Sequence, residues 1–338
     1  MGLQIGDIVS RKEISFSELK GKVIAVDAFN AIYQFLSSIR QPDGTPLMDS
    51  RKRITSHLSG LFYRNIALLS EGIKLIYVFD GEYHDLKARE HVLRGESKEK
   101  MRERYEEAKD EEDLEGMRKY SVGFMKLDEK MVKESKELLE ALGIGIVQAP
   151  GEGEMQCTQL VKDGEAWAVG SQDYDSLVVG GSRLIQNLTL ARKRKTRSGI
   201  VYIAPELIEY EKVLNELGIT ADQLICLAIL VGTDFNPGGV RGVGPKKALT
   251  LVREKKFPVR IFKEFEEQGK LDFDWKDVFE IFKKPNVKRG VKVKFLKFDF
   301  DKVKEILVGE HDFSLERVEK GLGKLDEVKK KVEQSTLF

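Results

Sequence analysis

The chain contains little cysteine and no long hydrophobic run. Its cysteines are Cys157 and Cys226, two in 338 residues, too few for a disulfide framework, and this favours a reducing compartment. The longest apolar run, Leu224–Val231, has eight residues, whereas a membrane-spanning helix needs about 20. Charged residues such as Asp7 and Arg11 interrupt the apolar start that a secretory signal would require. We therefore expect a cytoplasmic protein that does not enter a membrane.

An excess of charge of either sign is also missing. The 57 Lys and Arg residues nearly balance the 56 Asp and Glu residues, so the formal net charge is +1. An even basic surface that coats DNA is therefore not indicated, although separate acidic and basic patches are compatible with this sum. With 41% hydrophobic residues the chain can bury a core, and its length allows two domains or one large α/β domain.

Several common catalytic and metal-binding patterns do not occur. The four histidines, His57, His84, His91 and His311, show no ligand spacing, and neither cysteine has a partner at the spacing of a zinc site. There is also no Walker A sequence. Zinc and P-loop chemistry are therefore not indicated.

Short apolar runs predict a parallel sheet in the first half of the chain. The runs Val23–Val26, Leu75–Phe79 and Ala166–Val169 have the length of strands buried on both faces. Stretches of helical character lie between them, and this alternation is typical of βαβ units. From residue 205 the chain is predicted to be helical. The Lys-rich stretch 283–304, with interleaved Val and Phe, is predicted to form a hairpin or edge strands.

Acidic residues follow the predicted strands. Six of them stand directly at a strand end or in pairs spaced two apart, namely Asp27, Asp80, Glu152, Glu154, Asp173 and Asp175. Ligands of open α/β sheets bind at the carboxyl ends of the strands, so these carboxylates are expected to converge on one rim. Carboxylates that converge need a cation, and oxygen-only ligands select Mg²⁺ or Mn²⁺. A pair of such ions is the usual device for hydrolysing phosphodiesters.

Each acid also has a simpler interpretation. A single Asp after a strand is most often a helix cap or a turn residue, and an acidic pair in a loop is often only solvated. The interpretation as a site depends on acids occurring at several strand ends at once.

Residues 87–136 form an unusually charged segment, with 14 basic and 14 acidic side chains among 50 residues. It is either a solvated helical excursion with i,i+4 ion pairs or a helical arch over a site. Lys87 and Arg94 are seven residues apart, close to two helical turns, so both can face the same way. Beside an acidic rim they could stabilise the charge that develops on a scissile phosphate.

A Gly-rich turn favours contact with duplex nucleic acid. Gly242 and Gly244 precede a stretch that carries Lys246 and Lys247, which is the helix-hairpin-helix pattern. Glycines let a phosphate approach the backbone closely, and the following helix N-terminus offers free N–H donors. A plain Gly-rich turn is the alternative interpretation.

Two further features point to nucleic acid. The residues 192–197 include five basic side chains, among them Arg192, Lys193, Arg194 and Lys195, and form either an exposed loop or a phosphate-binding cluster. Tyr33 lies on a predicted helix six residues after the first acid, where it either packs in the core or stacks on a base.

Five sequence blocks together resemble the flap endonuclease family. They follow the family's order and spacing over essentially the whole chain, and they are VDAFNAIYQFL at 26–36, VFDG at 78–81, APGEGE at 149–154, SQDYD at 171–175 and GTDFNPGGV at 232–240. The short stretch between the second and third blocks and the absence of a long basic tail are similar to the archaeal form. The resemblance implies an α/β, PIN-like 5′ nuclease fold, in which helices flank a mostly parallel central sheet, with a helical arch and a helix-hairpin-helix region.

The resemblance also implies the ligands of two Mg²⁺ or Mn²⁺ ions. Those of the first ion correspond to Asp27, Asp80, Glu152 and Glu154. Those of the second ion correspond to Asp173, Asp175 and Asp234, and Asp234 is a seventh acid that the strand ends do not indicate.

Roles in DNA and partner binding follow from the same resemblance. Lys87 and Arg94 correspond to the catalytic basic pair at the base of the arch, and Tyr33 to the aromatic residue that stacks beside the scissile bond. The turn 242–247 corresponds to the duplex-gripping hairpin, which in the family also binds K⁺. The tail resembles the start of a sliding-clamp-binding motif through Gln334 and Leu337.

The expected organisation is a nuclease core at 1–215 with the arch at about 82–136, a helix-hairpin-helix region at 216–260, a helical or hairpin region packed on the core at 261–330, and the tail 331–338. We expect a monomeric, metal-dependent 5′ flap endonuclease and 5′–3′ exonuclease that acts on branched DNA in replication (Okazaki fragment maturation) and repair and leaves 5′-phosphates. The alternatives are a non-catalytic junction binder recruited by a clamp, an RNA-cleaving nuclease of related fold, and a 5′ exonuclease on nicks.

Overall fold

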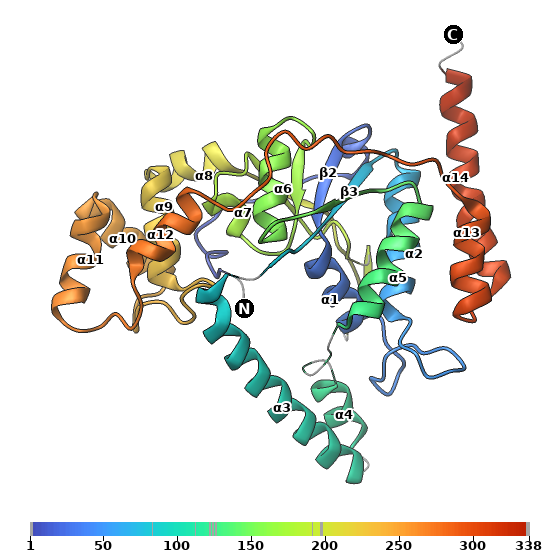
Figure 1. Cartoon of the computed structure of the whole chain (residues 1–338), viewed down its shortest axis with the longest axis horizontal. Helices are drawn as coiled ribbons and strands as arrows, with labels where there is room; N and C mark the ends of the chain where they lie inside the picture. Colours follow the sequence, from blue (N-terminus) through green and yellow to red (C-terminus); the bar gives the residue numbers. More distant parts are fainter. Residues whose placement is uncertain are drawn as a thin grey trace.

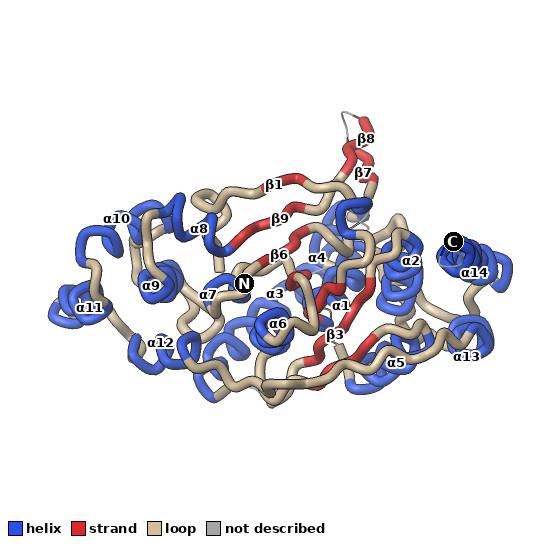
Figure 2. The backbone as a smooth tube through the Cα atoms, turned by 90° about the horizontal axis from the view of Figure 1, so that it is seen from above, coloured by secondary structure: helices blue, strands red, loops and turns tan. Residues whose placement is uncertain are grey.

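A mostly parallel sheet forms the centre of the computed structural model (Figures 1 and 2). The structure describes residues 3–82, 84–111, 113–121, 123, 125, 127–190, 192–196 and 199–335. The described residues form a seven-stranded sheet of order β1-β9-β6-β5-β2-β3-β4. Its strands, in chain order, are β1 Lys12–Glu13, β2 Val23–Asp27, β3 Lys74–Phe79, β4 Gly145–Gln148, β5 Ala168–Gly170, β6 Arg183–Gln186 and β9 Glu206–Glu209. The five strands from β6 to β4 are parallel, and β9 and β1 add an antiparallel edge, which confirms the predicted fold class.

Helices cover both faces of this sheet because successive strand residues point to opposite sides. Ile24 and Val26 of β2 pack in one hydrophobic cluster, and Ala25 between them packs in the other. The first cluster includes residues of α1 Ala28–Ser38, α2 Ser56–Ser70, α5 Glu129–Ala141, α13 Phe300–Lys304, the π-helix η3 Glu305–Glu310 and α14 Leu315–Ser335. The second includes residues of α6 Gly153–Lys162, α7 Asp175–Val178, α8 Tyr210–Leu217, α9 Ala221–Val231, α10 Pro245–Lys255, α11 Pro258–Glu267 and α12 Trp275–Lys283.

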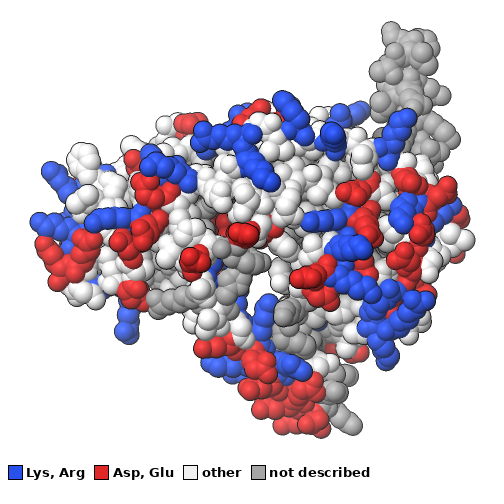
Figure 3. All heavy atoms as spheres, in the orientation of Figure 1, with Lys and Arg blue, Asp and Glu red and all other residues white. Residues whose placement is uncertain are grey.

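The charged segment forms helices that leave the sheet. A 3-10 helix, η2 Asp85–Lys87, leads into α3 Ala88–Asp110 and α4 Leu114–Tyr120, which project below the rest of the molecule in Figure 1. Acidic and basic side chains are crowded together on this projection in Figure 3, and both signs are mixed over the rest of that face. We call residues 85–120 the arch.

Two sequence-based expectations in the second half were wrong. The chain is not yet helical after Pro205, because Glu206–Glu209 forms β9 between β1 and β6, and helix α8 begins at Tyr210. The stretch 283–304 contains no strand among its residues, all of which are described: α12 ends at Lys283, and an extended segment, 284–299, leads to α13.

Side chains of α6 and of the turn after it replace a partner strand along this extended segment. Gln156 bonds both the N–H and the carbonyl of Lys288, and Asp163 accepts from the N–H of Gly290. Glu165 pairs with Lys292. The segment therefore satisfies backbone groups without a hairpin, and it runs along the molecule from α12 to α13 (Figures 1 and 2).

A cluster of four buried polar side chains connects α2, α5, the loop before α2 and the loop after η3. His57 Nε2 lies 3.8 Å from Glu134 Oε2, and His311 lies between Glu134 (3.5 Å) and Asp49 (3.4 Å). Burial lowers the pKa of His57 below its ordinary value.

Among the described residues no single helix is long and apolar enough to cross a membrane. Helices α8 and α9 would qualify only together, and they are bent by 81° relative to each other.

Burial of His57 predicts that this residue contributes less stability in mild acid. Below about pH 6.5 the unfolded chain takes up a proton that folded His57 resists, so the contribution of His57 to the free energy of unfolding should fall as pH decreases. Between pH 7 and pH 5 we expect the unmodified protein to lose about 1 kcal/mol more than His57→Gln in denaturant unfolding. His84→Gln, at an exposed position, is the control and should retain the pH slope. Equal slopes for all three proteins would contradict this prediction.

Candidate active site

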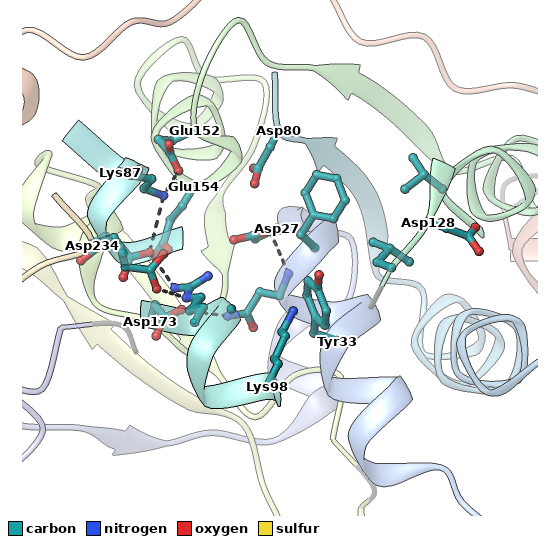
Figure 4. A pocket seen from close by; sticks show the side chains of 18 of the residues that line it. Asp27, Tyr33, Asp80, Lys87, Lys98, Asp128, Glu152, Glu154, Asp173 and Asp234 are labelled. Atoms are coloured by element: carbon teal, nitrogen blue, oxygen red, sulfur yellow. Dashed lines mark hydrogen bonds and ion pairs between the residues drawn. The ribbon is translucent and has the colours of Figure 1, made fainter. Parts of the chain in front are cut away.

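Seven carboxylates line one cavity of about 1430 Å³ at the carboxyl ends of the central strands (Figure 4). Asp27 ends β2, Asp80 follows β3, and Asp173 and Asp175 follow β5. The other three come from the start of α6 and from the turn after α9, namely Glu152, Glu154 and Asp234. The structure thus brings together all the acids that the sequence and the resemblance indicate.

Local hydrogen bonds hold three of these carboxylates in place. Asp27 accepts from the backbone N–H of Asn30 at 3.0 Å and is the N-cap of α1, so its capping role and its place on the rim coexist. Asp80 Oδ1 accepts from the N–H of Gly153 at 2.7 Å, and Glu154 Oε1 accepts from the N–H of Ser176 at 3.0 Å. Each bond leaves the second carboxylate oxygen available to a ligand.

The carboxylates destabilise one another in the absence of a cation. Burial and the charge of Glu152 raise the pKa of Asp80 to about 6, and burial with Asp173 and Asp234 raises the pKa of Asp175 to about 8. Burial also raises the pKa values of Asp27, Glu154 and Asp173. Asp175 Oδ1 is buried with no hydrogen-bond partner among the described residues. An all-oxygen donor set with an orphaned buried oxygen fits a hard divalent cation.

Two basic side chains reach this rim from the start of the arch. Lys87 Nζ bonds Glu152 and lies 3.5 Å from Asp234 Oδ2, and Arg94 Nη2 lies 3.0 Å from the same oxygen. Burial by itself would lower the pKa of Lys87, but Glu152 and Asp234 outweigh it and raise the pKa. In the described part of the chain, no group of three or more Asp, Glu, His or Cys side chains is gathered closely enough to hold a metal ion. Glu152 and Asp234 face these cationic side chains instead (Figure 4).

Tyr33 also lines the cavity. Its side chain comes from α1, it is 39% exposed, and Lys98 of α3 lies over its ring with Nζ 5.5 Å from the centroid. The ring is therefore available at the cavity wall and is not part of the core.

Three residues of the site escaped sequence analysis. Asn30 Nδ2 donates to Asp173 Oδ2 at 3.0 Å, Glu90 pairs with Arg94 within α3, and Phe235 lies beside Lys87. Asn30 stands three residues after Asp27, a position that faces the same end of the helix, and this spacing could have indicated it.

Comparisons with known proteins identify the family of the chain. The family models for the XPG N-terminal domain and the XPG I-region match residues 3–101 and 143–234. The flap endonuclease 1 of Pyrococcus furiosus is 49% identical over an alignment of 339 positions, which covers 100% of this chain and 98% of that protein. The chain belongs to the flap endonuclease family. The flap endonuclease 1 of Aeropyrum pernix is also 49% identical, with 96% of this chain and 94% of that protein covered.

Solved structures of the flap endonuclease family and its relatives share the fold. Flap endonuclease-1 from Methanococcus jannaschii is 40% identical with a TM-score of 0.76, and the match covers 97% of this chain and 98% of that chain. The catalytic core of Rad2 in complex with a DNA substrate is 23% identical with a TM-score of 0.69, covering 96% and 100%. The resemblance seen in the five sequence blocks is thus confirmed.

The turn that carries Asp234 is fastened at both ends. Thr233 Oγ1 bonds Asn236 Oδ1 at 2.7 Å, and Asn236 Nδ2 donates to the carbonyl of Ile229 at 2.7 Å. Gly239 has φ +56°, and a Cβ there would lie 2.4 Å from the carbonyl oxygen of Leu230. In this member of the flap endonuclease family, therefore, the Gly-rich block fixes the direction of an acid that lines the cavity.

Replacement of Gly239 tests this close approach. Gly239→Ala should lower the free energy of unfolding by about 2–4 kcal/mol, because it adds a backbone clash to an unfavourable φ. Gly238→Ala is the matched control: φ is +84° but a Cβ would meet nothing within 4 Å, so about 1 kcal/mol is expected. Denaturant unfolding measures both, and equal losses would contradict the steric argument.

The expected duplex-binding turn lies at the other end of the same loop. Gly242 has φ +79°, Gly244 is the N-cap of α10, and an added Cβ at either would meet nothing within 4 Å. Lys246 and Lys247 follow at the exposed start of α10, where Lys247 Nζ lies 3.4 Å from the carbonyl oxygen of Gly242. The protein's own packing leaves this turn open to a ligand.

The basic cluster at 192–195 is divided by the structure. Arg192 bonds Glu71 at 2.8 Å and lies over the ring of Phe16, so its guanidinium already has protein partners. Lys193, Arg194 and Lys195 lie in β7 Lys193–Thr196, which pairs with β8 Gly199–Tyr202 in a projecting hairpin (Figure 2).

Of the two tail residues expected to bind a clamp, Gln334 is in the last turn of α14, and Leu337 lies outside the described residues.

Proposed function

We propose that this member of the flap endonuclease family is a divalent-metal-dependent nuclease that hydrolyses DNA where a 5′ flap meets a duplex and leaves a 5′-phosphate. The observation that carries the proposal is the convergence of seven carboxylates on one cavity, with Lys87 and Arg94 at the same rim. A non-catalytic junction binder would not require such a costly set of buried acids. No observation favours that alternative.

Two Mg²⁺ or Mn²⁺ ions would be held by the acids of the cavity. Asp27, Asp80, Glu152 and Glu154 are the proposed ligands of the first, and Asp173, Asp175 and Asp234 of the second. When bound, such ions supply an activated water and stabilise the leaving oxygen. The fit rests on the donor set and on the buried, unpartnered Oδ1 of Asp175.

The chain's own side chains position the substrate. Lys87 and Arg94 would turn from their carboxylate partners to the oxygens of the scissile phosphate, where charge develops in the transition state. Tyr33 would stack on the nucleobase beside that bond. Each of these side chains lines the same cavity.

Shape would determine which DNA is cut. The turn with Gly242, Gly244, Lys246 and Lys247 would hold the duplex backbone without reading bases. Its carbonyl oxygens are proposed ligands of a K⁺ ion. Lys193, Arg194 and Lys195 of the projecting hairpin, together with Arg192 at its base, are proposed as further phosphate contacts.

The arch would admit the single 5′ strand. We also propose a monomer in the archaeal cytoplasm that binds a sliding clamp through Gln334 and Leu337, in replication and repair.

A labelled 5′ flap substrate tests the function. We expect cleavage near the junction in Mg²⁺, none in EDTA, and binding without cleavage in Ca²⁺. The product strand should then be joined by DNA ligase, which requires a 5′-phosphate. Nicked, gapped, blunt and RNA-flap substrates run in parallel are the controls. Binding without product in Mg²⁺ would support the junction binder, and faster cutting of RNA or of nicks would replace the flap assignment.

A further inference from the structure

Phe235 lies directly under the ammonium group of Lys87. Lys87 Nζ is 5.3 Å from the centroid of the Phe235 ring, within the range of a cation–π contact. The ring is 4% exposed and meets His84 (6.1 Å) and Phe282 (5.5 Å) edge to face. It therefore stands between the core, on the side of Phe282, and the start of the arch.

The backbone of the turn fixes where this ring points. The N–H of Phe235 donates to Thr233 Oγ1 at 3.1 Å, and Thr233 is in turn bonded to Asn236. Asp234 and Phe235 are adjacent on this fastened turn, and both contact Lys87. The turn thus presents a charged partner and an uncharged partner to the same ammonium group.

The uncharged partner, Phe235, can hold the Lys87 ammonium group in place without neutralising its charge. Lys87 has a flexible stem, and its carboxylate neighbours would draw Nζ into direct ion pairs, away from an incoming phosphate. An aromatic face attracts the ammonium group without neutralising it, and this attraction increases when water is excluded. The Lys87 side chain is only 10% exposed, so the condition is met.

We propose that Phe235 is a positioning residue that holds the Lys87 ammonium group at the rim, facing the scissile phosphate, through the face of its ring. The inference rests on the proposed nuclease function and adds a residue to it. Phe235 does not touch the reacting atoms; it acts through Lys87. If cations bind Glu152 and Asp234, the ring would still attract the ammonium group.

Substitution of the ring tests this role. Phe235→Leu keeps an apolar side chain but removes the aromatic face, and single-turnover flap cleavage should slow about 5- to 30-fold, the rate equivalent of about 1–2 kcal/mol. Binding of the flap in Ca²⁺ should stay within about twofold, since no phosphate contact is removed. Phe282→Leu is the matched control: it removes a buried ring that packs on Phe235 but not the contact with Lys87, and it should cleave at nearly the unmodified rate.

A double-mutant cycle separates positioning from a loosened turn. In a Lys87→Ala background, Phe235→Leu should cause no further loss of rate. An equal loss in both backgrounds, or an equal loss in Phe282→Leu, would show that the ring only supports the core and would overturn the proposal.

Fluorinated phenylalanines at position 235 give a second test that leaves the shape of the core intact. Each fluorine withdraws electron density from the ring face, so the logarithm of the single-turnover rate should fall steadily from one to three fluorines. A flat series with unchanged melting temperature would overturn the proposal. If the unmodified protein cuts no flap at all, the proposed function fails and the role of Phe235 falls with it, whereas a loss independent of Lys87 overturns only the role of Phe235.

Discussion

Asp175→Asn should abolish flap cleavage and at the same time stabilise the metal-free protein. Cleavage in Mg²⁺ should fall at least about 1000-fold, because a proposed metal ligand is lost. Burial and two neighbouring acids raise the pKa of Asp175 to about 8 in the fold, so its charge opposes folding. The neutral amide removes that repulsion and should raise the free energy of unfolding in EDTA at pH 8 by about 1–3 kcal/mol.

The sign of the pH dependence follows from the same shift. Unfolded Asp175 loses its proton near its ordinary pKa of 3.8, whereas the folded group keeps its proton up to about pH 8. Between these values the unfolded chain binds fewer protons, so the metal-free protein should lose stability as pH rises, and Asp175→Asn should reduce the slope. Denaturant unfolding in EDTA and in Mg²⁺ measures both effects. Asp301→Asn, on the exposed side of α13, is the control. An Asn variant that cuts normally would remove Asp175 from the site.

Lys87→Met should slow single-turnover cleavage by about 100- to 1000-fold, the usual loss when one stabiliser of transition-state charge is removed. The uncharged side chain can still pack on the Phe235 ring, so folding should be retained. Flap binding in Ca²⁺ should change by less than about threefold, because a contact made mainly in the transition state contributes little to ground-state affinity. The rate and the affinity are measured on the same labelled substrate.

Lys133→Met is the control for loss of a positive charge. The Lys133 side chain is 77% exposed, and it forms an ion pair with Glu137, one turn further along the same helix. Its replacement should leave the rate within about twofold. If Lys87→Met weakens binding as much as it slows cleavage, Lys87 is a simple phosphate anchor. If neither changes, it has no part in the reaction.

The sheet and its acidic rim were predictable because they depend on local patterns. A short apolar run such as Leu75–Phe79 predicts a buried strand, and an acid directly after the run then lies at the end of that strand. Asp234 was not predictable in this way. It follows a helix, and it reaches the rim only because the fastened turn after α9 returns to the sheet, so it entered through the family resemblance alone.

What the sequence did not predict depends on contacts between distant segments. The stretch 284–299 has the composition of a strand, but side chains of α6 and Asp163 bond its backbone where a neighbouring strand would. Arg192 stands beside Lys193 in the sequence, but in the fold it pairs with Glu71, 121 positions away, a partner that it would have to leave to contact a phosphate. Phe235 looks like a core residue until the fold places Lys87 over its ring.

The extended segment 284–299 has a consequence for the solubility of the chain. Strand β4 is the last strand on its side of the sheet, and an uncovered edge of this kind invites pairing with a second molecule. Val293 and Leu296 lie against it, so close that a Cβ on Gly145 would be 2.5 Å from the Val293 side chain and one on Gly143 would be 2.8 Å from the carbonyl oxygen of Leu296. A chain shortened to end at Lys284 would keep every acid of the rim, but it would lose α13, η3 and α14 from one hydrophobic cluster and would also open this edge to aggregation.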